Sequence, residues 1–182
     1  MMNSEKAIRS GIVIPISNIV LLPGAVTRLS VSDLSESQMR YLEDETIENV
    51  ALPMRQNFKR EDVSADDFYK LGVTFEIEEV QEIEKGYQLT MKVLDRVEVK
   101  ELSIEHSYIY AQFETSPDVK DMDEKSQKDM IGYMQQLTRE ISEKFPDGKR
   151  YVAVVESFGD LNSLIVYLSR FMQISNEEIY EL

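Results

Sequence analysis

The chain contains no cysteine, and this absence removes several kinds of chemistry at once. Disulfides, thiolate metal sites and cysteine nucleophiles are all excluded. A cysteine-free chain is also compatible with a reducing cytoplasm. The first residues, MMNSEKAIRSG, are polar and do not have the apolar core and small-residue cleavage site of a secretory signal. We therefore expect a cytoplasmic protein.

The chain is also short of basic side chains, because 20 lysines and arginines stand against 34 acidic residues and give a formal net charge of −14. A polyanion would be repelled by that average field, so we expect no nucleic-acid partner. The leading apolar runs are shorter than the roughly 20 residues of a membrane-spanning helix, so we expect no membrane partner. With 42% hydrophobic residues, however, the 182 residues suffice for a packed core.

Groups that carry out catalysis are scarce as well. His106 is the only histidine, and without a second histidine or a cysteine a surface or strand-end position is favoured over a metal site. The only Gly-Lys pair, Gly148-Lys149, is followed by Arg150 and has Glu143 where a phosphate-binding loop needs a glycine. We therefore expect no catalytic residue, no metal and no cofactor.

The first two thirds of the chain have the pattern of β-strands. Ile12–Val31 holds two apolar runs that hinge on Leu22-Pro23-Gly24, and its prolines exclude a helix interior. Apolar and polar residues alternate over Leu71–Phe113, with Gly86 placed for a hairpin turn, which predicts a meander of at least three strands. This region is therefore predicted to be a β-rich core.

Two shorter elements are predicted between these strands. Ser35 and Gln38 have the spacing of a capping box, which predicts a short helix. A strand follows through Val50 and Met54, and Pro53 within it argues for a sheet edge or a bulge.

At Ser116-Pro117-Asp118 the apolar period changes from two to about 3.6, which predicts helices. Pro146-Asp147-Gly148 separates the first two helices, and Asp160 is a candidate cap for a third. Ser175 and Glu178 form the capping box of a fourth helix, of about two turns, at the end of the chain. The first apolar stripe is Met122, Met130, Met134, Leu137, Ile141 and Phe145, and core packing is the favoured role of its methionines.

We therefore expect an α+β fold in three parts. Residues 1–10 are predicted to be a flexible N-terminus, and residues 11–117 a β-rich pseudo-barrel. Residues 118–182 are predicted to form a small helical bundle that is truncated in its last helix.

Six segments have short motifs that are informative together: Ile14-Pro15-Ile16, Val20-Leu21-Leu22, Pro23-Gly24, Leu71–Ile77, Val93–Val97 and Gly159–Ile165. These motifs and the order of the predicted elements resemble the N-terminal domain of Lon, the ATP-dependent protease family. The resemblance covers nearly the whole chain. There are two departures from the family pattern: Ser17-Asn18 stands for a frequent Arg-Asp, and Asp95 stands for a glycine. The resemblance implies a PUA-like fold for the β-rich part.

The resemblance also implies a function. It implies a non-catalytic domain that binds unfolded or damaged polypeptides and supports a hexamer with other Lon subunits. The ATPase and Ser-Lys protease domains of that family would lie elsewhere, since no serine here stands in a Gly-Pro-Ser context. Two alternatives are a stand-alone adaptor or regulatory protein without an ATPase, and an RNA-binding PUA-like module, against which the acidic charge argues.

A receptor for unfolded chains must expose apolar surface, and an open strand edge accepts an extended peptide by β-augmentation. We expect that surface at the edge around Pro53 and in the loop Val20–Ala25. The candidate substrate-binding residues are Leu21, Leu22, Pro23, Pro53 and Met54.

Five carboxylates crowd the first strand of the meander: Glu76, Glu78, Glu79, Glu82 and Glu84. A calcium site or a dock for basic segments is one interpretation. Strand alternation instead favours a solvated sheet face, because it places Glu76 and Glu78 on the side opposite Phe75 and Ile77.

Overall fold

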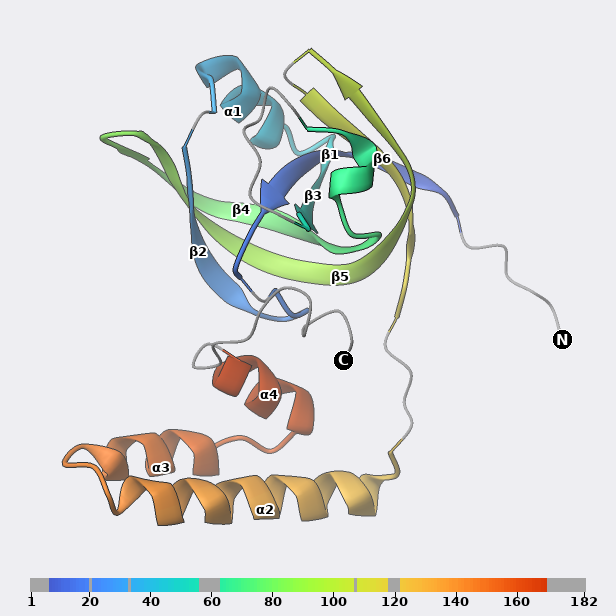
Figure 1. Cartoon of the computed structure of the whole chain (residues 1–182). Helices are drawn as coiled ribbons and strands as arrows, with labels where there is room; N and C mark the ends of the chain where they lie inside the picture. The colour runs from blue at the N-terminus through green and yellow to red at the C-terminus, as the bar shows by residue number, and fades with distance from the viewer. Residues whose placement is uncertain are drawn as a thin grey trace, which may run out of the picture. The chain divides into compact units, whose positions relative to one another are not determined.

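The computed structural model describes residues 7–19, 21–32, 34–55, 63–106, 108–117 and 122–169. These residues form two compact units, residues 7–117 and residues 122–169. The first unit contains a six-stranded sheet with one α-helix, and the second contains three helices (Figure 1). The fold is thus α+β, as predicted.

Some predictions fall on residues outside this description. They are most of the predicted flexible N-terminus (residues 1–10), the predicted stripe residue Met172 and the predicted capping box at Ser175 and Glu178. The predicted regions 11–117 and 118–182 also include such residues, and their boundaries stay predictions.

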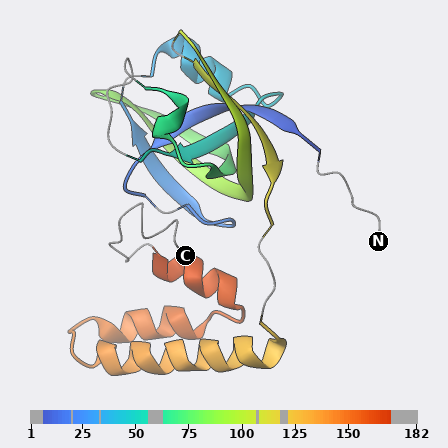
Figure 2. The same ribbon diagram turned by 45° about the vertical axis from the view of Figure 1, so that its right-hand side comes forward.

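The sheet of the first unit closes on itself. Its order is β2-β5-β4-β3-β1-β6, and β6 pairs a second time with β5, so the strands curl round a shared interior (Figures 1 and 2). The pair β1–β3 is parallel and the other pairs are antiparallel. The strands are β1 (Arg9–Ile16), β2 (Val26–Val31), β3 (Glu48–Pro53), β4 (Leu71–Ile83), β5 (Gly86–Glu105) and β6 (Tyr108–Thr115).

The interior of this sheet is filled with branched and aromatic side chains, which pack well on a pleated surface. Strands β1, β3, β5 and β6 contribute to one buried cluster, together with Met54 and Phe68 that follow β3 and precede β4. Its buried residues are Val13, Val50, Leu52, Met54, Phe68, Val97, Val99, Ile109, Ala111 and Phe113.

The turns follow the sequence signals. Gly86 begins β5 with φ of 103°, a conformation that glycine adopts without steric cost, and it completes the predicted β4–β5 hairpin. His106 has φ of 57° and is exposed between β5 and β6, which confirms its predicted surface position at a strand end.

Helix α1 (Glu36–Leu42) begins with the predicted capping box. The Gln38 backbone N–H donates to Ser35 Oγ over 3.3 Å, and the Ser35 backbone N–H donates to Gln38 Oε1 over 2.8 Å. The helix packs on the sheet through Met39 and Leu42, and Tyr41 makes an edge-on ring contact with Tyr108 of β6. A single 3-10 turn, η2 (Ala65–Asp67), precedes β4.

The second unit consists of α2 (Glu124–Ser142), α3 (Gly148–Glu156) and α4 (Leu161–Ser169). Asp160 caps α4 as predicted, because the Ser163 backbone N–H donates to its Oδ1 over 2.8 Å. The unit packs around Ile131, Val155 and Leu164. No described helix is long and apolar enough to cross a membrane.

The predicted core stripe of α2 is partly wrong. Ile131 is the buried residue of this helix, and Met134 packs beside it against α3 and α4. Met130 is exposed instead, because only the narrow face around Ile131 meets the two shorter helices. The other stripe residues on the exposed face are Leu137, Ile141 and Phe145.

Candidate functional site

The predicted loop residues Leu21, Leu22 and Pro23 lie between β1 and β2, while Val20 is outside the described residues. Leu21 is buried, whereas Leu22 and Pro23 are half-buried. The loop is attached to β5, because the Gly24 N–H donates to the Val93 carbonyl over 3.0 Å. Of the three predicted loop residues, Leu22 and Pro23 therefore offer apolar surface.

The prediction of a sheet edge at Pro53 is wrong. Strand β3 lies between β1 and β4, and the pairing with β4 ends at Ala51, so the missing N–H of Pro53 costs that ladder no hydrogen bond. The Met54 N–H donates to the Ile16 carbonyl over 2.9 Å, and the Met54 side chain is only 6% exposed. Pro53 and Met54 are therefore covered in this structure.

The open strand edge lies on β4 instead. β3 pairs with β4 only between Val73 and Phe75, but β4 continues to Ile83 and pairs on its other side with β5. Within the described part of the chain, no strand pairs with the second side of residues 76–83. Backbone N–H and C=O groups on such an edge are a template for an added strand.

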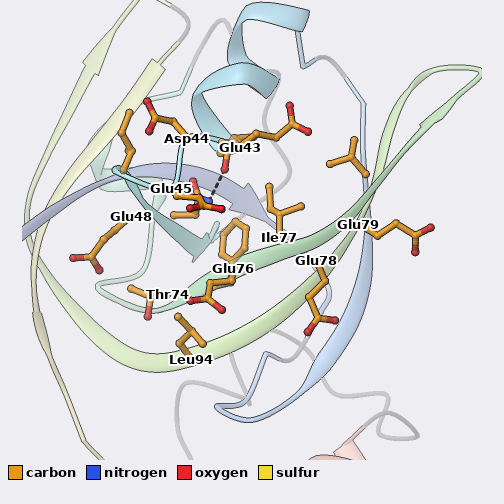
Figure 3. A pocket seen from close by; sticks show the side chains of 15 residues that line it. Glu43, Asp44, Glu45, Glu48, Thr74, Glu76, Ile77, Glu78, Glu79 and Leu94 are labelled. Carbon is orange, nitrogen blue, oxygen red and sulfur yellow. Dashed lines mark hydrogen bonds between the residues drawn. The ribbon is translucent and has the colours of Figure 1, made fainter.

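A groove of about 850 Å³ runs along this edge (Figure 3). One wall is β4 and the other is the end of α1 with the loop that leads to β3. Figure 3 shows Glu43 and Asp44 on the loop side and Glu76, Glu78 and Glu79 along β4. The acidic lining residues are Glu43, Asp44, Glu45, Glu48, Glu76, Glu78 and Glu79, and none of the described lining residues is basic.

The side chains of β4 do not alternate as the sequence predicted. The register with β5 shifts between Ile77 and Glu79, so Glu78 is an extra residue in a bulge. Val80 therefore lies opposite the buried Leu89, on the same face as Ile77. All five carboxylates of this glutamate-rich stretch are exposed, which agrees with a solvated face. Three of them, Glu76, Glu78 and Glu79, also line the groove and share its second wall.

The charges of the groove are only partly compensated by neighbouring cations. Arg9 donates from Nε to Glu48 Oε1 over 2.8 Å, and these hydrogen bonds raise the pKa of the Arg9 guanidinium. Asp44 accepts from the backbone and hydroxyl groups of Thr46, which lowers the pKa of the Asp44 carboxyl. Among the described residues no ion pair joins a cation to any of the other six acidic lining residues.

Asn49 lies in the wall of the groove and is 7% exposed. Its Nδ2 donates to the Leu42 carbonyl over 2.8 Å. Its Oδ1 is buried and accepts no hydrogen bond in the described structure. A buried acceptor without a partner is unfavourable by roughly 1–3 kcal/mol, so such a group needs an explanation.

A metal site is the other chemistry that clustered carboxylates suggest. The described residues contain no group of three histidine, cysteine or acidic side chains arranged to hold a metal ion. The calcium interpretation of the acidic strand therefore has no support there.

The sequence did not point to the second wall of the groove. Glu43, Asp44 and Glu45 follow α1 and meet β4 only because β3, which comes next, pairs with β4. The run Glu-Asp-Glu directly before a predicted strand was the available signal, but its neighbour depends on a pairing that a local pattern does not specify.

The fold is that of a Lon N-terminal domain. The solved structure titled N terminal domain of Mycobacterium avium complex Lon protease matches 95% of this chain and 88% of its own, with a TM-score of 0.70 and 15% identity. The family model of the ATP-dependent protease La (Lon) substrate-binding domain matches residues 12–182. The chain therefore belongs to the family of Lon substrate-binding domains.

Two curated relatives have the name Lon protease. The protein of Clostridium beijerinckii is 47% identical over 182 residues, which are all of this chain and 23% of that protein. The protein of Methanosarcina barkeri is 21% identical over 172 residues, which are 93% of this chain and 21% of that protein. The chain thus spans less than a quarter of the length of these relatives.

Proposed function

We propose that this chain receives unfolded or damaged polypeptides as the non-catalytic substrate-binding part of a Lon protease. Its family membership supports this proposal, as does the 47% identity to a Lon protease. The observation that carries it is the open edge of β4 beside a groove of about 850 Å³. An unfolded chain offers an extended backbone, and an open strand edge recognises backbone rather than one particular fold.

The remaining steps would belong to other parts of the parent protein. ATP hydrolysis and peptide cleavage would take place in domains outside the region that matches here. Other Lon subunits would be partners in a hexamer, and the protein would work in the cytoplasm without a metal or cofactor of its own in this part.

The alternative is a stand-alone adaptor or regulatory protein with the same fold. The intact mass of the native protein separates the two, measured after pull-down from the source cell. The adaptor predicts a mass near 21.1 kDa, the mass of this chain. A Lon subunit predicts a mass several times larger, with ATPase and protease peptides in its digest.

The binding step itself is tested by titration. A reduced and carbamidomethylated protein stays unfolded without added charge, and its native disulfide-bonded form is the matched folded control. We expect the chain to bind the unfolded form and not the native form. Equal affinity for both forms, or no binding by a chain whose circular dichroism shows that it is folded, would contradict the proposed function.

A further inference from the structure

We propose that the free edge of β4 beside the acidic groove takes up an extended polypeptide segment that carries lysine or arginine side chains. The segment adds to β4 as a further strand, and its cations lie among the groove carboxylates. This inference rests on the proposed function and gives it a substrate class.

The backbone of β4 sets the geometry of the added strand. β3 occupies the neighbouring position as far as the pair Asn49–Phe75, and the added segment continues that line along residues 77–83. At about 3.3 Å per residue, seven residues of edge extend for roughly 20 Å. The edge is therefore long enough for a segment of ordinary strand length.

The charge of the groove determines which side chains the incoming segment should carry. Seven of its fifteen described lining residues are acidic and none of them is basic, so within the described structure the groove has no counterion apart from the Arg9 partner of Glu48. Carboxylates held on two facing walls repel one another, and cations from an incoming segment relieve that repulsion.

Asn49 adds an observation independent of the carboxylates. Its amide oxygen is a buried acceptor in the wall of the groove, and no described donor reaches it. An acceptor in that position takes a hydrogen bond from an N–H group, and both a lysine side chain and an extended backbone supply such a group. An acidic or purely apolar segment would leave the carboxylates uncompensated.

Other occupants fit the groove less well. A second copy of this chain would bring two acidic edges together, and nucleic acid would meet the same repulsion. A metal ion has no group of three suitable ligands among the described residues. The charge therefore favours a cationic polypeptide.

Three labelled peptides of twelve residues test the charge preference by fluorescence anisotropy. They share alternating valines and differ only in the intervening residues, which are lysine, glutamine or glutamate. We expect the lysine peptide to bind most tightly and to lose affinity as salt rises. Equal affinity of the lysine and glutamine peptides would overturn the inference.

Matched variants locate the site on β4. E78Q/E79Q removes two carboxylates from the groove. E101Q/E105Q removes two exposed carboxylates of β5 that lie outside the groove and beyond the pairing of β5 with β4. At roughly 0.2–1 kcal/mol for each exposed ion pair, E78Q/E79Q should weaken the lysine peptide about 2- to 30-fold. An equal loss in E101Q/E105Q would mean that only the overall charge matters, which overturns the site.

Two N-methylated lysine peptides test the strand addition. One carries methyl groups on the odd backbone nitrogens and the other on the even ones, so only one of them blocks the N–H groups that face β4. We expect one to lose binding and the other to keep it. Equal binding of the two would overturn strand addition.

The unfolded carbamidomethylated protein separates this inference from the proposed function. If that protein binds but the lysine peptide shows no preference, the inference fails and the proposed function stands. If neither binds to the folded chain, both fail.

Discussion

Asn49 of β3 lies opposite Phe75 of β4, and this is the last pair in which the two strands meet. Toward the N-terminus of β3 the chain turns away into the acidic loop after α1, while β4 continues to Ile83. One pair thus marks the end of the ladder, the start of the open edge and the wall of the groove.

Replacing Asn49 by leucine should separate the binding role of this residue from its structural role. The variant loses the hydrogen bond to the Leu42 carbonyl but also removes the unpartnered Oδ1. These two effects oppose each other, so we expect the free energy of unfolding in urea to change by less than about 1 kcal/mol. Affinity for the lysine peptide should fall, because the acceptor is gone.

Asn49→Asp is the control for this position. It keeps an acceptor of the same shape but places a charge where the side chain is almost fully buried, so it should lower stability clearly. A large destabilisation by Asn49→Leu as well would show that the amide has a structural role only.

We expect a glycine to be required at position 72, because β4 approaches β3 closely there. A Cβ built at this position would lie 2.6 Å from the Ala51 carbonyl oxygen and 2.9 Å from Leu52 Cδ1. The backbone would have to shift, so we expect Gly72→Ala to lower the free energy of unfolding by roughly 1–3 kcal/mol.

Gly132 provides the matched control for that substitution. It lies inside α2, and a Cβ there meets nothing within 4 Å. Gly132→Ala should therefore stabilise its helix by roughly 0.5–1 kcal/mol. Urea unfolding of both variants checks the pair, and a neutral Gly72→Ala would mean that β3 and β4 are not held so closely.

Much of the local structure was readable from the sequence. The capping box at Ser35, the turn at Gly86 and the cap at Asp160 depend on residues a few positions apart, and all three are confirmed. The alternation over Leu71–Phe113 likewise predicted the meander, because burial of one sheet face gives a period of two.

What was missed depends on long-range pairing. Pro53 has no backbone N–H to donate in any strand, but whether it marks an edge depends on where the β3–β4 ladder ends. The bulge at Glu78 shifts the later residues of β4 by one position and has no signature in a run of glutamates. The second wall of the groove needs both the pairing and the loop, so no single segment could reveal it.

We still expect the loop residue Leu22 to bind apolar parts of unfolded chains. Because the side chain is half-buried, we expect Leu22→Ser to leave the fold intact. Loss of about 1 kcal/mol of apolar contact would weaken binding of the carbamidomethylated protein roughly fivefold. Unchanged affinity would remove Leu22 from the site.

Met54→Ala is the contrasting variant. Its side chain belongs to the core cluster, so truncation should cost roughly 2–5 kcal/mol of stability through the cavity that it leaves. We expect any effect on binding to follow the unfolded fraction measured by circular dichroism. A binding defect in fully folded Met54→Ala would restore Met54 as a contact residue.

The helical unit should lose stability in acid through its aspartate caps. The Ser126 N–H donates to Asp123 Oδ1 over 2.8 Å and the Ser163 N–H donates to Asp160 Oδ1 over 2.8 Å, and these bonds lower the pKa of both carboxyls. A lowered pKa in the folded state means that the stabilisation is fully present above the unfolded value of 3.8. It is lost as the pH falls from there through the folded pKa.

The double variant D123N/D160N tests this pH dependence, because asparagine still caps a helix but does not titrate. Between pH 5 and pH 2.5, the thermal midpoint of the helical signal should fall further in the unsubstituted chain than in the variant. D129N removes an aspartate from the exposed face of α2 without touching a cap, so it should keep the full decrease. If all three proteins lose the same number of degrees, acid acts on the chain through other carboxylates and not through the caps.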